Sequence, residues 1–437
     1  MKKISSFLLP LVVLSLVATT AFSAENAFNL PAAEPEEVGM SSERIDRVTN
    51  VMKNFVDEGK VKGLLTAIVR DGKVVHFETY GMMDAEQAKP MKDDTLFRMY
   101  SMTKIVTGVA VMMLYEEGHF TLNDPISTFL PEYENMTVYA GKDKTVPANK
   151  PITFKHLLTH TAGISYDFYE GTPIAELYKK NGLTIQAAYN NDTSLEEFCK
   201  TLAKQPLANQ PGEAWHYGMS IDVLGRLVEV ISGQDYGDFL DERVFKPLGM
   251  VDASFTVTDD KLDRFAANYA KLPNGKLMPI DPPKNSLYRK ESPLEFGGAG
   301  MVCTAMDYLR LAQMLVNGGE LDGVQLLSPT TVNLMTSDHL SDSLGDNPLS
   351  QLFAGDSFTG VSFGLSGSVV TSPAANGNTG SVGEFSWGGA ASTDFWIDPK
   401  EKLVGIVLTQ LMPAGIEPTR TKMHQMTYQA ITESYAD

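Results

Sequence analysis

Hydrophobic residues recur every three or four positions near the start of the chain, which is the spacing of an amphipathic helix. The pattern predicts a helix over residues 36–58 and then a β-hairpin over 64–80. The strands of the hairpin flank Asp71 and Gly72, a pair typical of a two-residue turn. A further apolar stripe predicts a helix from Ser101 to about Gly118. The first quarter of the chain therefore predicts helix, hairpin and helix.

The middle of the chain, residues 122–281, alternates apolar helical segments with polar loops rich in Pro, Asn and Gly. Its clearest helices are predicted over 153–162 and 222–232, and each ends at a glycine. A glycine-rich turn at 297–300 and a helix over 304–317 follow. Period-two and continuous apolar runs then predict strands and a closing helix: strands over 358–370, 383–387, 393–397 and 402–409, and a helix over 418–435.

This order of elements indicates an α+β fold. One antiparallel sheet would be built from both ends of the chain and flanked by helices, and the helical middle would be an inserted lobe. We predict a single domain over 24–437, with an α/β lobe at about 35–118 and 294–437 and a helical lobe at about 119–293. Ser101 would then lie at the seam between the lobes.

The first residues have the pattern of an export signal. Two lysines at positions 2 and 3 precede an apolar run over 7–19, and Ala21 and Ser23 place small residues at −3 and −1 before Ala24. We expect a signal peptide over 1–23 that is cleaved, and a periplasmic or secreted protein without a stable membrane anchor. The alternatives, an uncleaved anchor or a buried N-terminal helix, fit less well because the apolar run is short for a span.

Composition narrows the class of partner. The chain has 437 residues, 43% of them hydrophobic, which is ample for a large core. A net charge of −18 argues against nucleic-acid partners and against anionic lipid surfaces, and it says nothing of oligomeric state. Cys199 and Cys303 are too few for a zinc site or a disulfide framework. They could pair, but their apolar surroundings favour two separate buried thiols.

The candidate chemistry begins at Ser101 and Lys104. Residues three apart on a helix are neighbours, so the amine can lie beside the hydroxyl. A serine hydroxyl is a poor nucleophile until a base takes its proton, and a lysine amine is such a base once burial disfavours its charged form. At a helix start, backbone N–H groups also lie near the oxygen. The S-x-x-K spacing alone is weak, because it recurs by chance.

Two distant stretches could complete a site around Ser101, with the glycine turn at 297–300 as a third. Tyr217 directly precedes an apolar helix, and a phenol near an ammonium can relay protons. Trp387 is followed by Gly388 and Gly389, which would let a strand backbone come close to a bound acyl group. A backbone N–H in that strand could help to stabilise an oxyanion.

Together these motifs resemble the serine β-lactamase-related hydrolases, and in particular the class C β-lactamase-like esterases. The resemblance spans about residues 35–432 and is carried by four stretches in order: 100–104 (YSMTK), 156–163 (HLLTHTAG), Tyr217 with 222–225 (DVLG), and 387–389 (WGG). It implies acylation of Ser101, proton transfer by Lys104 and Tyr217, and an oxyanion hole formed by the N–H groups of Ser101 and Ala390. It implies neither a metal nor a cofactor.

Two departures from the lactamase pattern favour esters. Met219 stands where lactamases and D,D-peptidases carry an asparagine, and Trp387, Gly388 and Gly389 stand where they carry Lys-Thr-Gly. Without the amide and the ammonium, donors for a β-lactam are missing, and a Trp supplies an apolar wall. These four residues are the predicted substrate-binding set, for a small-molecule ester or amide. The alternatives are a β-lactamase, D,D-peptidase or D-amino-acid amidase, or a penicillin-binding-like receptor with little turnover.

Other motifs compete less well. Ser362 lies in a G-x-S-x-G sequence, but a hydrolase elbow needs a helix after it, whereas strands are predicted there. His156 and His160 are four apart, yet no third metal ligand is near. Tyr133 and Tyr189 each begin a Tyr-x-Asn triplet, but neither precedes the expected helix. We therefore expect an exported serine hydrolase that cleaves carboxylic esters through Ser101.

Overall fold

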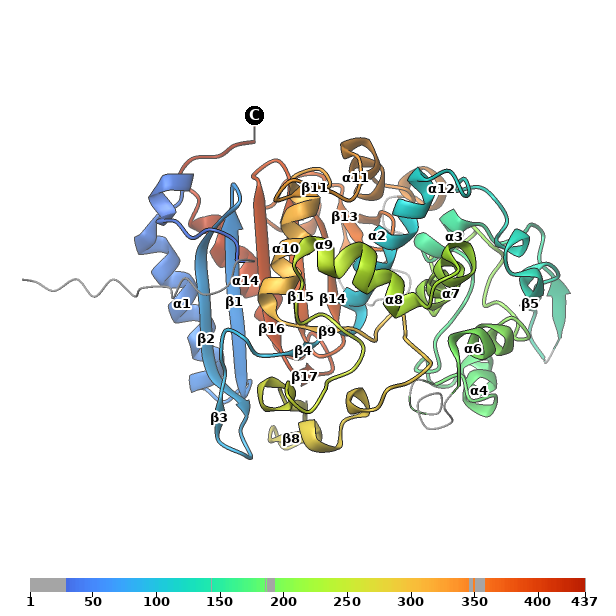
Figure 1. The fold of residues 1–437 in the computed structure, drawn as a ribbon, viewed down its shortest axis with the longest axis horizontal. Helices are drawn as coiled ribbons and strands as arrows, with labels where there is room; N and C mark the ends of the chain where they lie inside the picture. Colours follow the sequence, from blue (N-terminus) through green and yellow to red (C-terminus); the bar gives the residue numbers. More distant parts are fainter. Residues whose placement is uncertain are drawn as a thin grey trace, which may run out of the picture.

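An eight-stranded antiparallel sheet forms the centre of the molecule (Figure 1). The computed structural model describes residues 29–142, 144–184, 186, 193–345, 349 and 358–436. The sheet joins strands from both ends of the chain, as predicted. Its order is β12 (Val361–Phe363), β13 (Ser368–Val370), β14 (Phe385–Gly389), β15 (Thr393–Asp398), β16 (Leu403–Thr409), β1 (Gly63–Arg70), β2 (Lys73–Asp84) and β3 (Lys89–Pro90).

The hairpin of β1 and β2 is confirmed. Asp71 and Gly72 both have positive φ, 48° and 75°, as a type I′ turn requires. Strand β1 is buried on both sides because its side chains alternate between two cores. Leu65, Ala67 and Val69 belong to one core, and Leu64 and Ile68 to the other. The sheet therefore separates two apolar layers.

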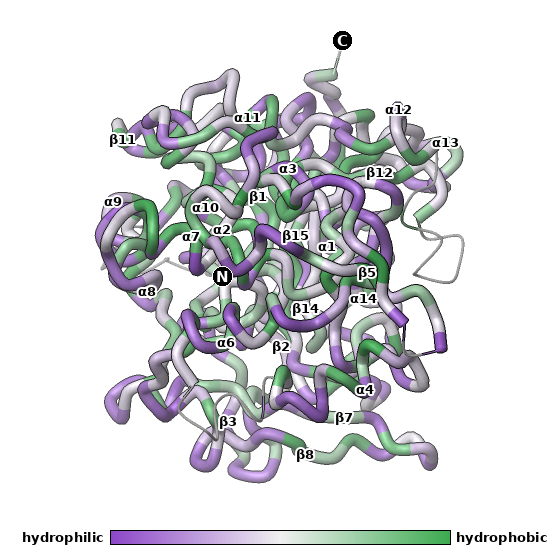
Figure 2. The backbone as a smooth tube through the Cα atoms, turned by 90° about the vertical axis from the view of Figure 1, so that its right-hand side faces the viewer, coloured by the Kyte–Doolittle hydropathy of each residue, from purple (hydrophilic) through white to green (hydrophobic). Residues whose placement is uncertain are grey.

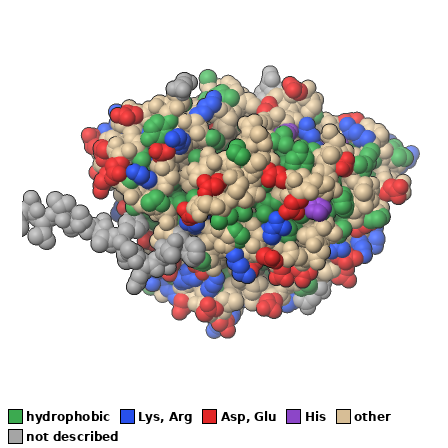
Figure 3. Space-filling view, turned by 45° about the horizontal axis from the view of Figure 1, so that its top comes forward, with side chains coloured by type: hydrophobic (Ala, Val, Ile, Leu, Met, Phe, Trp, Pro, Cys, Tyr) green, Lys and Arg blue, Asp and Glu red, His purple; other side chains and the backbone are tan. Residues whose placement is uncertain are grey.

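Different helices cover the two faces of the sheet. Helices α1 (Ser42–Asp57) and α14 (Thr419–Gln429) pack against each other and contribute to the core on one face. Helices α10 (Ala305–Val316) and α2 (Thr103–Glu116) belong to the core on the other face. Hydrophilic positions gather in the peripheral loops (Figure 2). Acidic and basic side chains are interspersed on the face that Figure 3 shows.

The middle of the chain forms short helices to one side of the sheet (Figure 1). Helix α2 packs directly on one of them, α7, so that it lies between the sheet and the helical segments. The main ones are α3 (Phe154–Leu158), α4 (Pro173–Lys180), α6 (Leu195–Leu202), α7 (Ser220–Ser232) and α8 (Tyr236–Leu240). The position of α2 explains why residues at its start can be reached from both parts of the chain.

Three predicted helices are shorter in the structure. The first begins at Ser42 because Gly39, at φ 69°, ends a separate 3-10 turn at residues 35–38. The helix predicted over 153–162 ends at Leu158, and His160 follows at φ 53°, which a helix cannot accommodate. The last helix ends at Gln429, and Arg70 binds the carbonyl of Glu433 beyond it.

Two predicted strands also need correction. The segment predicted over 358–370 is two strands, β12 and β13, joined by a turn in which Ser366 has φ 75° and Gly364 N–H donates to the Gly367 carbonyl. Strand β14 starts and ends two residues later than predicted, so that the glycines after Trp387 lie within the strand. The strands β15 and β16 and the helices α7 and α10 match the predicted segments within two residues.

The remaining predictions concern the cysteines, the location of the protein and the boundaries of its lobes. Cys199 and Cys303 are both free and buried, as predicted. Among the described residues, no helix combines the length and apolar content needed to cross a bilayer. The predicted signal peptide and Tyr189 lie outside the described residues. The boundaries proposed for the two lobes stay a prediction.

Candidate active site

Ser101 lies at a sharp turn between a short strand and helix α2. Strand β4 (Phe97–Arg98) pairs with β9 (Val302–Cys303), and Tyr100 then takes a positive φ of 45°. Ser101 itself is in a 3-10 turn, so that the helix starts at Thr103 and not at Ser101 as predicted. A tyrosine in this conformation is strained, and such strain is typical of functional sites. The Tyr100 hydroxyl accepts a hydrogen bond from Asn268 at 2.9 Å.

The structure brings Ser101, Lys104 and Tyr217 together. Lys104 Nζ lies 3.3 Å from Ser101 Oγ, and the Tyr217 hydroxyl lies 2.7 Å from the same oxygen. Ser101 is half-buried, whereas Lys104 is fully buried and Tyr217 is 7% exposed. The serine is thus in hydrogen-bond contact with two groups that can carry its proton.

Lys104 is held on the side away from Ser101 by the glycine turn. Its Nζ donates to the Gly298 carbonyl at 2.6 Å, and the Gly298 N–H donates to Asp222 Oδ1 at 2.9 Å. Burial raises the pKa of Asp222 to about 6, and the nearby charge of Lys104 opposes that rise. A Cβ on Gly298 would come within 2.7 Å of the Asp222 carboxylate, which explains the glycine.

A second tyrosine, Tyr166, contacts the lysine and was missed by the sequence interpretation. Its hydroxyl lies 3.1 Å from Lys104 Nζ, and the residue is 6% exposed. Lys104 Nζ also lies 4.7 Å from the centre of the Tyr217 ring. Tyr166 comes three residues after Gly163, at the end of one of the motifs. Its position just after that motif was the one signal in the sequence that could have identified Tyr166. Residues in a loop show no hydrophobic periodicity that would identify them.

The backbone around Tyr217 is held from three sides. The N–H of His216 donates to the His160 carbonyl at 2.7 Å, and that of Met219 to the Ser165 carbonyl at 3.2 Å. The hydroxyl of Tyr169 donates to the Tyr217 carbonyl at 3.0 Å. The segment before α7 therefore has little freedom, and the phenol is pre-positioned next to Ser101.

The imidazole of His160 packs against Tyr217 and so forms one side of this site. Its ring centre lies 4.7 Å from that of Tyr217, and its side chain is fully buried. Burial places the pKa of His160 well below its usual value, and the charge of Lys104 acts in the same direction. The imidazole is therefore neutral. His156 is used differently, since its Nδ1 accepts the N–H of Thr153 at the start of α3.

The two glycines of β14 have different neighbours. A Cβ on Gly389 would lie 2.4 Å from the carbonyl oxygen of Met99, in the segment that leads to Ser101. A Cβ on Gly388 would lie 2.1 Å from Asp394 Oδ1, on the opposite face of the sheet. We had expected both glycines to admit a bound acyl group. The structure shows instead that Gly389 makes room for the Met99 carbonyl and Gly388 for a carboxylate, so contact of either glycine with an acyl group stays a prediction.

Trp387 contacts the tyrosine of the candidate site. Its Nε1 donates to the Tyr217 hydroxyl at 3.4 Å, and its side chain is 6% exposed. Ala390 follows Gly389 and is half-buried. Met219 is 1% exposed and belongs to the apolar core. The roles of Ala390 in an oxyanion hole and of Met219 in substrate binding stay predictions.

The competing serine has no such surroundings. Ser362 lies fully buried in β12, and its hydroxyl donates to Asp338. The chain continues into strand β13 and not into a helix. The interpretation of this motif as a glycine-flanked strand is confirmed.

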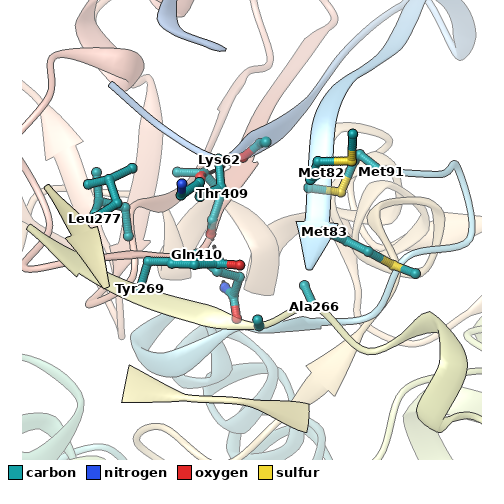
Figure 4. Close-up of a pocket in the computed structure, with 12 residues that line it drawn as sticks. Lys62, Met82, Met83, Met91, Ala266, Tyr269, Leu277, Thr409 and Gln410 are labelled. Carbon is teal, nitrogen blue, oxygen red and sulfur yellow. Dashed lines mark hydrogen bonds between the residues drawn. The ribbon is translucent and has the colours of Figure 1, made fainter. Parts of the chain in front are cut away.

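A surface cavity at the end of strands β1 and β2 is separate from this site (Figure 4). Met82, Met83, Met91, Tyr269 and Gln410 are among the residues that line it. Ser101, Lys104 and Tyr217 are not.

Comparison with known proteins agrees with the geometry. A family model described as Beta-lactamase matches residues 48–424. Protein Rv1367c of Mycobacterium tuberculosis is 36% identical over 374 residues, which are 83% of this chain and 89% of that protein. Esterase EstB of Burkholderia gladioli is 28% identical over 386 residues, 85% and 91% of the two chains.

A solved structure of a hydrolase has the same fold as this chain. EstCE1, described as a hydrolase with promiscuous acyltransferase activity, superimposes with a TM-score of 0.74 at 27% identity, over 88% of this chain and 98% of that one. The chain therefore belongs to the β-lactamase family. It is a serine hydrolase of the carboxylesterase type that acts on esters, and the predicted α+β fold, of the kind found in β-lactamases and penicillin-binding proteins, is confirmed.

Proposed function

We propose that Ser101 is the nucleophile of this esterase and forms an acyl-enzyme. The observation that carries the proposal is the contact of Ser101 Oγ with both the Tyr217 hydroxyl and Lys104 Nζ. Ser101 Oγ bonds to the ester carbonyl carbon while its proton passes to one of these two groups. The carbon–oxygen bond to the alcohol then breaks, and the alcohol leaves with a proton. Water adds to the acyl-enzyme in the same way and releases the acid.

The negative charge of each tetrahedral intermediate needs donors. In this proposal the N–H groups of Ser101 and Ala390 supply them, since Gly389 allows β14 to approach the Ser101 turn. Lys104 in its neutral amine form or Tyr217 in its phenolate form can receive the first proton, because both contact the serine oxygen. The loss of either side chain should therefore lower kcat far more than it raises KM.

Replacement of the nucleophile tests the proposal. Ser101→Ala should abolish hydrolysis of p-nitrophenyl acetate and butyrate, and it should abolish labelling by a fluorophosphonate. Ser362→Ala is the matched control, because that buried serine belongs to a strand and has no role in the proposed chemistry. Full activity of Ser101→Ala would end the proposal.

We propose esters, and not β-lactams or D-alanyl amides, as the preferred substrates. Trp387 contacts Tyr217 through its ring nitrogen and presents an apolar ring where lactamases place a lysine. Met219 is an apolar core residue and offers no amide. A panel of short-chain esters, nitrocefin and D-alanyl amides should show kcat/KM highest for the esters. Nitrocefin turnover equal to ester turnover would favour the lactamase alternative.

Acyl transfer to an alcohol is a second candidate reaction. It is supported by the description of EstCE1 as a hydrolase with promiscuous acyltransferase activity. An acyl-enzyme surrounded by aromatic side chains can be attacked by an alcohol in place of water. Addition of an alcohol during turnover of p-nitrophenyl butyrate should yield the new butyrate ester, which mass spectrometry detects. Butyric acid as the sole product would exclude it.

We also infer that the chain is exported. The inference rests on the basic start, the apolar run and the small residues before Ala24. Expression of the full chain in a bacterium should yield a periplasmic or secreted protein whose first residue is Ala24. An intact N-terminus in the cytoplasmic fraction would contradict it.

A further inference from the structure

The loop between α3 and α4 (Figure 1) carries three aromatic residues within four positions, Tyr166, Phe168 and Tyr169. Phe168 is 54% exposed. Single exposed apolar residues are common, so this exposure by itself indicates no function. What distinguishes Phe168 is its contact. Its ring stacks on that of Tyr166 with centres 4.7 Å apart and planes 23° apart.

The stacked rings connect the exposed Phe168 to the candidate site. The hydroxyl of Tyr166 touches Lys104 Nζ, and its ring centre lies 5.4 Å from that of Tyr217. Tyr217 in turn lies 5.5 Å from Trp387. Phe168 is thus the solvent-exposed end of a row of rings, and one residue, Tyr166, separates it from Lys104.

Ring contacts and hydrogen bonds hold this loop in place. Tyr169 lies 4.8 Å from Phe168, ring to ring, and its hydroxyl donates to the Tyr217 carbonyl. The backbone N–H of Ser165 donates to the hydroxyl of Tyr178 on α4. Phe168 therefore sits next to residues that are tied to the site, which suits a binding surface that must be pre-organised.

The proposed reaction defines which part of the ester meets this loop. The departing alcohol oxygen must receive a proton from Tyr217 or Lys104, so it has to leave on their side of the carbonyl carbon. In the proposed function the oxyanion points instead toward the N–H of Ala390, the residue after β14. Tyr166 contacts Lys104 and packs near Tyr217, and Phe168 stacks on Tyr166, so we infer that Phe168 borders the side on which the alcohol leaves.

We propose that Phe168 is a specificity-determining residue that binds the alcohol portion of the substrate and favours aromatic alcohols. The proposal rests on the ester hydrolysis argued above. One face of the Phe168 ring is taken by Tyr166. Its exposed remainder offers a flat apolar surface, on which an aromatic group gains more than a saturated group of the same size.

The experiment compares esters that differ in the alcohol alone. 2-Phenylethyl acetate and 2-cyclohexylethyl acetate share the acyl group and the CH₂ next to oxygen, so their intrinsic reactivities are close. Phe168→Ala should lower kcat/KM for the phenylethyl ester by about three- to tenfold, with a smaller effect on the cyclohexylethyl ester and little on ethyl acetate. Phe168→Tyr should keep the aromatic preference.

Controls separate this proposal from the proposed function. Val251→Ala removes another exposed apolar side chain, 63% exposed, and should leave the ratio of the two esters unchanged. Ethyl phenylacetate and ethyl cyclohexylacetate vary the acyl group, and Phe168→Ala should not change their ratio. An unchanged phenylethyl-to-cyclohexylethyl ratio in Phe168→Ala, or a change that follows the acyl group, overturns the proposal. Activity retained by Ser101→Ala would instead overturn the proposed function.

Discussion

At the scale of single residues, the environment of Lys104 decides what the serine can do. The buried amine of Lys104 has the Gly298 carbonyl as one partner and two hydroxyls as the others, and those hydroxyls lie within reach of proton exchange. Ser101 is one of them and Tyr166 is the other. Tyr166 thereby fixes where the amine points, and it acts as a positioning residue.

Removal of the Tyr166 hydroxyl should therefore slow the chemical step. We expect Tyr166→Phe to lower kcat by about tenfold, the scale of one hydrogen bond to a charged group, with KM for ethyl acetate nearly unchanged. Tyr133→Phe is the control, because it removes a buried hydroxyl that donates to the Cys199 carbonyl. Equal losses of kcat in both variants would mean that Tyr166 has a structural role alone.

At the scale of elements, strand β14 must lie close to the Ser101 turn. The Cβ that Gly389 lacks would stand 2.4 Å from the Met99 carbonyl and 2.2 Å from Thr393 Oγ1. Neither neighbour can move freely, since one is backbone and the other belongs to β15. The proposed oxyanion hole depends on this approach, because Ala390 is the next residue.

Gly389→Ala should thus impair catalysis more than folding. We expect kcat to fall by on the order of 100-fold, because a displacement of about 1 Å has that effect on positioned groups. Gly405→Ala is a control from the same sheet, where a Cβ would meet the Trp396 ring. It should lower the melting temperature while the folded fraction keeps its kcat. A Gly389→Ala variant with unchanged kcat would contradict this role of β14.

The start of helix α10 gives a pH-dependent prediction. Asp307 accepts the N–H of Thr304 at 3.1 Å and is 2% exposed. Burial raises the pKa of Asp307 from 3.8 to about 6. The folded state therefore holds this proton over a range in which the unfolded chain releases it. The contribution of Asp307 to stability is largest below pH 3.8 and is lost as the pH rises through 6.

Asp307→Asn keeps the hydrogen-bond acceptor without the buried charge. We expect the variant to have a free energy of unfolding about 1–3 kcal/mol higher than the native protein at pH 8, and the difference to shrink toward pH 4. Urea denaturation across this range measures it. The partly exposed Asp124 gives a pH dependence of the opposite sign, because the hydrogen bond from the Thr121 N–H lowers the pKa of that carboxyl. Asp124→Asn should lower the free energy of unfolding above pH 4.

At the scale of the whole molecule, a buried arginine joins the two ends of the chain. Arg70 of β1 donates to the carbonyl of Gly39 at 2.9 Å, to Glu401 Oε2 at 2.5 Å and to the carbonyl of Glu433 at 2.7 Å. The central sheet contains strands from both ends, so this contact closes the fold. Arg70 is fully buried.

Arg70→Met should destabilise the molecule by about 3–5 kcal/mol, because it leaves the buried Glu401 carboxylate without its cationic partner and removes hydrogen bonds to three carbonyls. The exposed pair of Lys402 and Asp71 is the comparison, and Lys402→Met should change stability by less than about 1 kcal/mol. Urea unfolding measures both. Below its transition, Arg70→Met should keep its kcat, and equal stability of the two variants would contradict the prediction.

Sequence patterns were sufficient to predict the main helices and strands and the pairing of Ser101 with Lys104. Period-two and helical patterns located the hairpin, α7, α10, β15 and β16, because burial of one face imposes that spacing. The three-residue spacing of Ser101 and Lys104 was enough to place them side by side, since a turn of helix or 3-10 helix brings such residues together. The motifs also indicated the family, which the comparisons confirmed.

Tertiary structure alone decided the rest. Tyr217 is 116 residues from Ser101 in sequence, and its contact depends on how α7 packs against α2. Tyr166, the facing of Gly389 and the left-handed turn at Tyr100 follow no period, because they are set by backbone contacts between distant segments. Local spacing predicts which residues share a face. Which faces then meet is determined by packing of the whole chain, and that packing completes the site.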